Sequence, residues 1–277
     1  MKNELILEVK KKREFSGLPD SIVERALVMS GALSIETRPP AQVLRASLAD
    51  SVLEKSRKRD LDLKSKEVVK DARALLRKYF GVFLTNKVLK GKGVGVLESH
   101  ISSRERDYEK VYGKIIGDEN VIVDLGCGAN GFSFEKISEL GKKRYVGVEA
   151  TGQLVKSTND YFKENDFDAR IVCEDLMNFE KVLDIVAREN GEKAVWMFNV
   201  VDALENFEKD YSKKLIDGIF GVESVDRVVI SLPVESISGR KKFNVSRLWL
   251  TDFLENKYRI VDDFLAGHER VFIVRRK

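Results

Sequence analysis

The sequence predicts an α/β fold in which a mostly parallel sheet is covered by helices, joined to a separate helical part at the N-terminus. From about residue 120, short β-rich runs alternate with helical stretches. Before residue 92 the apolar residues recur at helical spacings, without a convincing strand. Gly91, Gly93 and Gly95 mark a joint between the two parts. The sequence thus predicts two domains, residues 1–95 and 96–277.

The N-terminal part is expected to contain three helices. Pro19 and Asp20, and later Pro39, stand where helices commonly begin. The predicted ranges are Ser21 to Met29, Pro40 to Lys58 and Ser65 to Lys78.

The C-terminal part is expected to form a Rossmann-like sheet of seven strands. Five strands are predicted to be parallel, at Val121 to Asp124, Tyr145 to Val148, Arg170 to Cys173, Val195 to Val200 and Val228 to Leu232. The helices between and after them are predicted at Phe132 to Leu140, Gln153 to Lys163, Phe179 to Glu189, Lys209 to Phe220 and Leu248 to Asn256. A terminal hairpin, Tyr258 to Asp262 and Arg270 to Val274, makes the last strand antiparallel to its neighbour.

The charge is distributed unevenly along the chain. Residues 1–92 contain 21 Lys and Arg against 12 Asp and Glu, a net charge of +9, whereas the remainder contains 28 against 33, a net charge of −5. A basic module joined to a mildly acidic one suggests that the first part meets a polyanion such as RNA. A solvated helical surface is the alternative interpretation.

Composition excludes several classes of protein. With 43% hydrophobic residues in 277, the chain is expected to fold, and it contains no apolar run long enough to span a membrane. Two cysteines are too few for a disulfide framework or a zinc site, so no metal is expected. We expect a soluble, cytoplasmic protein. Its many Lys and Glu residues, with glutamine only at Gln42 and Gln153, are typical of thermophiles.

A glycine motif follows the first predicted strand. Gly126, Gly128 and Gly131 stand in the G-x-G-x-x-G register between a strand and a helix, where the backbone turns sharply and approaches a ligand. By itself the motif fits a dinucleotide site or a tight turn.

Three acids favour S-adenosylmethionine over a nicotinamide dinucleotide. Asp124 ends the first strand, where it can act on the cationic end of this cofactor, and Glu149 ends the second, where a carboxylate accepts ribose hydroxyls. Asp175 follows the third and is placed to accept from the adenine amino group. All three lie on the carboxyl edge of one sheet, where open α/β sheets bind ligands.

Three blocks of sequence carry a family resemblance. They are HISSRER at residues 100–106 with Tyr108 and Tyr112 after it, DLGCGAN at 124–130, and SLP at 231–233 with SISGR at 236–240. Together they resemble the small-subunit (16S) ribosomal RNA methyltransferases of the aminoglycoside-resistance type, class I S-adenosylmethionine-dependent enzymes that modify N7 of a guanine in the decoding region. The basic helical part is similar to the ribosome-docking domain of that family.

The resemblance implies a set of cofactor contacts. Arg106 would pair with the methionine carboxylate, and His100 and Ser102 would line the same pocket; an ion pair of Arg106 with Asp107 or Glu109 is the alternative. The cofactor-binding residues expected in all are His100, Ser102, Arg106, Asp124, Gly126, Gly128, Glu149, Asp175 and Leu176.

The chain departs from the family where the target base is expected. Asn199 and Phe207 stand where the family has Lys and Gln, so the family's target atom, guanine N7, cannot be assigned directly to this chain. Residues 199–202, NVVD, partly match the motif with which amino-methyltransferases orient an exocyclic amine such as cytosine N4. Asn199 and Asp202 are therefore the predicted catalytic residues. For Asn199 the alternative is a turn residue at a strand end.

Residues expected to contact RNA surround the same place. Phe207 and Phe243 are candidates for stacking on an extruded base, and Arg240 and Lys241 for phosphate contacts. Core packing and a solvated cluster are the alternatives. Cys127 and Cys173 are expected to be small buried packing residues rather than nucleophiles.

The sequence therefore predicts an S-adenosylmethionine-dependent methyltransferase acting on a base nitrogen, cytosine N4 or guanine N7, in the decoding region of small-subunit ribosomal RNA, with the RNA or the 30S-type subunit as partner. A non-catalytic ribosome-assembly factor and a transfer-RNA methyltransferase are the alternatives.

Overall fold

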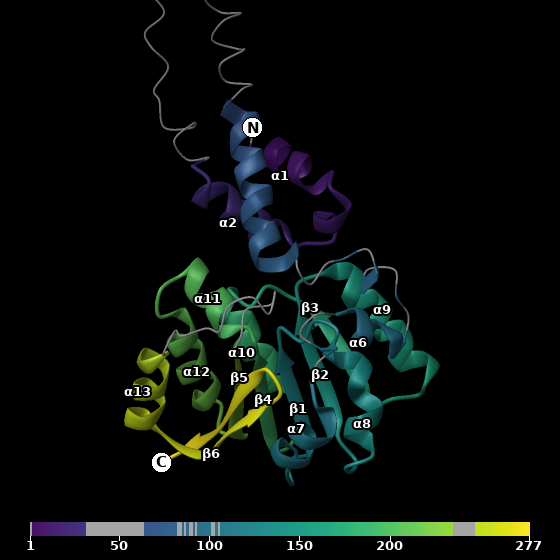
Figure 1. Cartoon of the computed structure of the whole chain (residues 1–277), viewed down its shortest axis with the longest axis vertical. Coiled ribbons are helices and arrows are strands. Elements are labelled where there is room, and N and C mark those ends of the chain that lie inside the picture. The colour runs from purple at the N-terminus through teal and green to yellow at the C-terminus, as the bar shows by residue number, and fades with distance from the viewer. Residues whose placement is uncertain are drawn as a thin grey trace, which may run out of the picture. The chain divides into compact units, whose positions relative to one another are not determined.

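A computed structural model describes residues 2–31, 64–81, 85, 87–88, 91, 93–100, 103–104, 106–234 and 247–277. The chain divides into two compact units, Met1–Leu84 and Thr85–Lys277 (Figure 1). Four of the predicted site residues, Ser102, Arg240, Lys241 and Phe243, lie outside the described residues, as does the predicted helix Pro40 to Lys58.

The described part of the first unit consists of helices joined by short turns. It contains α1 (Lys2–Lys10), the short turn η1 (Arg13–Phe15), α2 (Asp20–Met29), a helix over 64–76 and a π-helical end, η2 (Arg77–Gly81). Val9, Val23, Ala26 and Leu76 are buried, so each of these helices turns one apolar side inward. Arg73 on the third helix donates to the carbonyl oxygen of Glu8 at the end of α1.

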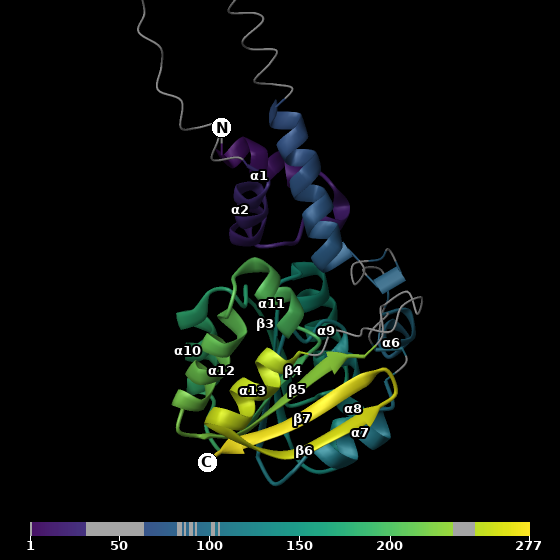
Figure 2. The same cartoon turned by 60° about the vertical axis from the view of Figure 1, so that its left-hand side comes forward.

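The second unit is built on a seven-stranded sheet of order β3-β2-β1-β4-β5-β7-β6, which confirms the predicted architecture (Figure 2). The strands are β1 (Val121–Leu125), β2 (Arg144–Glu149), β3 (Ala169–Cys173), β4 (Lys193–Phe198), β5 (Val225–Pro233), β6 (Tyr258–Ala266) and β7 (Glu269–Arg276). The first five are mutually parallel, and β7 runs antiparallel to both β5 and β6.

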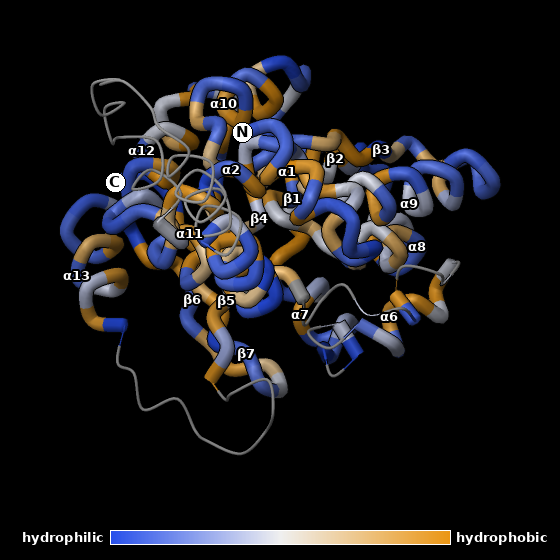
Figure 3. The backbone as a smooth tube through the Cα atoms, turned by 90° about the horizontal axis from the view of Figure 1, so that it is seen from above, coloured by the Kyte–Doolittle hydropathy of each residue, from blue (hydrophilic) through white to orange (hydrophobic). Residues whose placement is uncertain are grey.

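Helices cover both faces of this sheet. They are α6 (Gly95–Ser99), α7 (Tyr108–Ile115), α8 (Phe134–Ser138) after the turn η3 (Asn130–Ser133), α9 (Gly152–Glu164), α10 (Phe179–Arg188), α11 (Val201–Phe207), α12 (Tyr211–Gly221) and α13 (Leu248–Lys257). Hydrophobic and hydrophilic residues alternate along the helices, as Figure 3 shows by its orange and blue segments. This alternation is typical of helices that bury one face.

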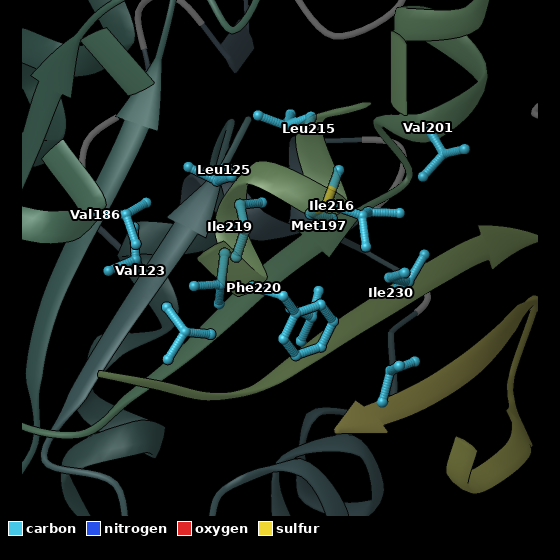
Figure 4. Close-up of a cluster of buried hydrophobic side chains, with 14 of the residues drawn as sticks. Val123, Leu125, Val186, Met197, Val201, Leu215, Ile216, Ile219, Phe220 and Ile230 are labelled. Carbon is cyan, nitrogen blue, oxygen red and sulfur yellow. The ribbon is translucent and has the colours of Figure 1, made fainter. Parts of the chain in front are cut away.

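The core has an aliphatic side and an aromatic side. Val186 of α10 and Ile216 and Ile219 of α12 pack with Val123 and Met197 of the strands (Figure 4). On the other side, Tyr145 of β2 meets Phe134 of α8 and Phe162 of α9, at ring-centroid distances of 5.9 and 6.1 Å. The central strands β1 and β4 are buried along their whole length, as expected for a parallel sheet covered on both faces.

The end of β4 differs from the prediction. The predicted strand Val195 to Val200 stops at Phe198, because Asn199 takes a left-handed backbone conformation with φ of 56°. Among the residues other than glycine, asparagine is one of those that adopt this conformation most readily. The chain then enters α11, a helix that the sequence analysis missed. Asn199 is thereby held at the carboxyl edge of the sheet.

The terminal hairpin brings a late segment to the same edge. Because β7 is antiparallel to β5, its first residue, Glu269, pairs with Pro233 at the carboxyl end of β5. The start of β7 and the ends of β1, β2 and β4 thus share one side of the sheet.

Candidate functional site

The loop after β1 contains two glycines in the left-handed backbone region, where a residue with a side chain would be strained. Gly126 and Gly128 have φ of 73° and 51°. A Cβ at Gly126 would overlap the Val200 side chain and lie 3.3 Å from Leu176 Cδ1. At Gly126 the backbone of the loop therefore lies between the apolar side chains of Val200, which follows β4, and Leu176, which follows β3.

Asp124 is a fully buried carboxyl group beneath this loop. Its Oδ2 accepts hydrogen bonds from Asn130 Nδ2 and from the Tyr145 hydroxyl, each at 2.7 Å. Its Oδ1 is buried and has no hydrogen-bond partner among the described residues. Burial raises the pKa of Asp124 to about 6, although the two hydrogen bonds oppose the shift. Asp124 Oδ1 is therefore a buried acceptor that a ligand with an N–H or O–H group could hydrogen-bond.

Asn130 joins Asp124 to a second polar group. While its Nδ2 donates to Asp124, its Oδ1 accepts from Arg106 Nη1 at 3.0 Å and from the Tyr112 hydroxyl at 3.1 Å. A role for Asn130 was not predicted, although it lies within the DLGCGAN block. The amide of Asn130 is thus fixed in one orientation and connects Asp124 with Arg106.

Arg106 forms a buried ion pair with Glu269. Its Nη2 lies 2.7 Å from Glu269 Oε1 and its Nε 3.2 Å from Oε2, with side-chain exposures of 3% and 8%. Burial disfavours the charged guanidinium, but the Glu269 carboxylate outweighs it and raises the pKa of Arg106. The guanidinium also lies over the Phe198 ring, 4.6 Å from its centroid. The alternative pairing with Asp107 is not observed: Asp107 accepts from the backbone N–H of Lys110 and begins α7.

Glu269 was missed by sequence reasoning. It stands 163 residues from Arg106 and belongs to none of the recognised blocks. The only available signal was the predicted hairpin, which brings the start of the last strand to the carboxyl edge.

Asn199 joins the same cluster. Its Nδ2 donates to Glu269 Oε1 at 2.6 Å, and its backbone N–H donates to the carbonyl oxygen of Ser231 at 3.1 Å. Its Oδ1 is buried and makes no hydrogen bond within the described part of the chain. Asn199 is therefore more than a turn residue, since a buried carboxylate orients its amide.

The two remaining predicted acids lie at the ends of β2 and β3. Glu149 accepts from the backbone N–H of Gly128 at 3.0 Å and from that of Thr151 at 2.7 Å, so it ties the glycine loop to the start of α9. Asp175 is buried and accepts from the backbone N–H of Met177 at 2.9 Å. Leu176 follows it and flanks Gly126.

His100 lies against the other end of the loop. A Cβ at Gly128 would be 3.4 Å from His100 Nε2, and its Nδ1 is 2.8 Å from the Ser103 hydroxyl. Burial, helped by the Arg106 charge, lowers the pKa of His100 to about 4. The ring is therefore a neutral neighbour of the loop at physiological pH.

Asp202 is placed differently from the rest. Its carboxylate accepts from Arg247 Nε at 2.9 Å and Nη2 at 2.5 Å, while Arg247 Nη1 donates to the carbonyl oxygen of Pro233 at 3.1 Å. This ion pair ties α11 to the residue before α13. Phe207 ends α11 and is half-buried.

The cysteines correct one expectation. Cys127 is buried as predicted, but Cys173, the last residue of the edge strand β3, is exposed. Within the described ranges no cluster of three His, Cys, Asp or Glu residues could hold a metal ion. None of the helices described is long and apolar enough to cross a membrane.

No protein-family model matches the chain. Among curated proteins, the redox-sensing transcriptional repressor Rex of Clostridium tetani is 36% identical over 75 residues, which are 26% of this chain. The chain thus spans 35% of the length of that repressor.

Solved structures match over the full length. The 16S rRNA methylase RmtB superposes with a TM-score of 0.70 at 18% identity, covering 100% of this chain and 99% of that one. An rRNA methylase from Escherichia coli gives 0.71 at 19% identity, with 100% of both chains covered. The 16S rRNA methyltransferase RmtF, in complex with S-adenosyl-L-homocysteine, gives 0.71 at 17%, covering 100% and 98%. The predicted methyltransferase fold is confirmed.

Proposed function

We propose that this chain is an S-adenosylmethionine-dependent methyltransferase that modifies a base nitrogen, cytosine N4 or guanine N7, in the decoding region of small-subunit ribosomal RNA. The observation that carries the proposal is the buried cluster of Asp124, Arg106 and Asn199 at the carboxyl edge of a sheet shared with 16S rRNA methylases.

The cofactor's polar groups find matching residues around the glycine loop. Asp124 Oδ1 is buried and accepts no hydrogen bond from the residues that the structure describes, so it is proposed to accept one from the ammonium group of the cofactor. Each carboxylate oxygen of Glu149 accepts a hydrogen bond from one backbone N–H and has a second lone pair that can accept from a ribose hydroxyl. Asp175 and Leu176, which follow β3, are proposed to contact adenine, and Gly126, Gly128 and His100 are proposed to contact the cofactor from the loop side. Ser102 is assigned to the same pocket by resemblance.

Arg106 keeps capacity for the methionine carboxylate despite its ion pair. A guanidinium has five N–H donors. Two of them donate to Glu269 and one to Asn130, so the ion pair does not occupy every donor of the guanidinium. In our proposal the remaining donors bind the carboxylate, while Glu269 holds the guanidinium in place.

The cofactor supplies an electrophilic methyl group, and the residues of this chain position the nitrogen that receives it. Asn199 is proposed to act on the target base directly. Asp202 is proposed to act through Arg247, which it holds against the end of β5. Phe207 and Phe243 are proposed to stack on the base, and Arg240 and Lys241 to bind phosphate.

The basic N-terminal domain, residues 1–95, is proposed to dock on the ribosomal RNA or the 30S-type subunit, and residues 96–277 to carry the reaction. The net charge of +9 over residues 1–92 supports the first assignment. Such an enzyme would work in the cytoplasm, where ribosomes are found.

Transfer of a labelled methyl group tests the proposal. The full chain is incubated with labelled S-adenosylmethionine and, separately, with small subunits, large subunits, naked small-subunit RNA and transfer RNA. Incorporation confined to small subunits or their RNA is expected. Labelling of transfer RNA alone would show that the chain is a transfer-RNA methyltransferase instead. Binding to small subunits that needs no cofactor and yields no labelling would favour an assembly factor.

A further inference from the structure

We infer that Glu269 is a positioning residue that locks the Asn199 amide with Oδ1 as an acceptor, so that the site selects an exocyclic amino group over a ring nitrogen such as guanine N7. This inference rests on the proposed methyltransferase function and narrows its substrate class.

The orientation of Asn199 follows from the hydrogen bonds of Glu269. Both carboxylate oxygens accept from Arg106, and Oε1 also faces the Asn199 amide at 2.6 Å. Because a carboxylate oxygen in these bonds accepts and does not donate, the atom of Asn199 that faces it must be the NH₂ nitrogen. The amide oxygen is consequently turned away from Glu269.

That oxygen lacks a partner where one is expected. Asn199 Oδ1 is buried and unbonded within the ranges that the structure describes. Leaving a buried acceptor unpaired costs about 1–3 kcal/mol, so such groups normally acquire a donor. A ligand that brings an N–H group would supply it.

The position of Asn199 suits a target nitrogen. Its backbone is fixed at the carboxyl end of β4 by the bond to Ser231 and by its φ of 56°. The next residue, Val200, lies against Gly126 of the glycine loop. An N–H held by Oδ1 would therefore lie beside the segment proposed to bind the methyl donor.

An acceptor distinguishes the two classes of nitrogen. The lone pair of an exocyclic amine is delocalised into the ring, and holding one of its hydrogens turns the nitrogen toward the methyl carbon. The new N–C bond then forms as the S–C bond breaks, its electron pair stays on sulfur, and the nitrogen releases one proton to water. Guanine N7 has a lone pair and no hydrogen, so Oδ1 would repel it.

Identification of the methylated nucleoside tests the substrate class. Small subunits are methylated by the full chain with S-adenosylmethionine, and the RNA is digested for mass spectrometry against nucleoside standards. N4-methylcytidine is expected, because cytosine N4 is the exocyclic amine of the two proposed targets. 7-Methylguanosine would overturn the inference and leave the proposed function standing, whereas no methyl transfer to any RNA would overturn both.

Two variants test the role of Glu269. Asn199→Gly removes the amide while glycine tolerates the left-handed backbone, and Glu269→Gln removes the carboxylate. We expect kcat to fall about 10²-fold for Asn199→Gly, with the affinity for S-adenosylhomocysteine by calorimetry unchanged. Glu269 also holds Arg106, so kcat is measured with saturating S-adenosylmethionine, where a weakened cofactor contact appears in KM. Under these conditions Glu269→Gln should lower kcat little further in the Asn199→Gly background.

The control is Asp263→Asn, which removes a carboxylate paired with Arg270 on the exposed hairpin, at 2.6 Å. It should leave kcat and cofactor affinity unchanged. If Asn199→Gly instead weakens S-adenosylhomocysteine binding tenfold or more and leaves kcat intact, Oδ1 serves the cofactor ammonium and the inference is wrong. Independent, additive losses of kcat in the two variants would also contradict it.

Discussion

The Glu269 carboxylate receives two hydrogen bonds from the Arg106 guanidinium, at 2.7 and 3.2 Å, and so joins the last strand of the sheet to the segment that precedes α7. A third bond, from Asn199 at 2.6 Å, brings in the end of β4. The terminal hairpin is therefore part of the candidate site as well as part of the sheet.

Removing one partner of this ion pair should destabilise the fold strongly. Arg106→Met leaves Glu269 buried without its guanidinium, and we expect the free energy of unfolding to fall by about 3–5 kcal/mol. Chemical denaturation measures it. The double variant Arg106→Met/Glu269→Leu should recover much of the loss, because no unpaired charge remains. Equal stabilities of the single variant and the wild type would contradict this account.

Asp124 should give a characteristic pH dependence of stability. Because burial raises its pKa from 3.8 to about 6, the folded state binds the proton more tightly than the unfolded chain does. Its contribution is complete below pH 4 and is lost as the pH rises through 6, a change of about 3 kcal/mol. His100, whose pKa falls to about 4, contributes with the opposite sign, losing stability as the pH falls below 6.5. The difference between wild type and Asp124→Asn isolates the first effect.

Asp124→Asn keeps an oxygen for Asn130 and Tyr145, so it should fold and gain stability relative to wild type as the pH rises from 4 to 7. A constant difference across this range would show that Asp124 does not titrate as described.

Cofactor binding should depend on the same group. If Asp124 holds an ammonium as a carboxylate, the affinity for S-adenosylhomocysteine should be constant above pH 6 and weaken about tenfold per unit below it. Calorimetry at constant ionic strength measures the profile. Asp124→Asn should bind weakly at every pH, and an unchanged profile in that variant would remove Asp124 from the site.

Glu149→Ala should lose most of the cofactor affinity and keep the fold. The variant removes the proposed ribose acceptor and the ties to Gly128 and Thr151, and we expect a loss of about 10²-fold or more. Calorimetry measures the affinity, and circular dichroism checks the fold. Glu164→Ala, at the exposed end of α9, is the matched control and should bind normally. Equal affinities in both variants would exclude Glu149.

Binding of the full chain to small-subunit RNA should weaken steeply with salt. With six or more phosphate contacts, affinity should fall about 10³-fold or more between 50 and 200 mM salt. Lys12 and Lys70 are exposed in the first unit, and reversing both to Glu should lower both the affinity and the salt slope. Lys136→Glu, on α8 of the second unit, is the control. Salt-independent binding would refute the docking role of the basic domain.

Much of the sheet could be predicted because β1, β2, β4 and β5 are buried on both faces and their sequences are nearly continuous apolar runs. The terminal hairpin was predicted from the short connection around Gly267. Helix α11 was missed because residues 201–207 are separated from β4 by only two residues, and the strand was extended across Asn199. Nothing in the local pattern marked the left-handed turn that ends the strand.

The site was predicted wherever its residues follow a strand. Asp124, Glu149 and Asn199 could be placed on one edge by counting from strand ends. Asn130 and Glu269 could not, because their roles depend on partners brought close only by tertiary packing. The Arg106 ion pair spans 163 residues, a distance over which spacing carries no information.

Nucleoside mass spectrometry of small-subunit ribosomal RNA, compared between the source organism and a strain that lacks this gene, determines whether the chain methylates that RNA in the cell. One methylated base should disappear from the decoding region of the deletion strain and return when the gene is restored. An unchanged methylation profile of that RNA would contradict it.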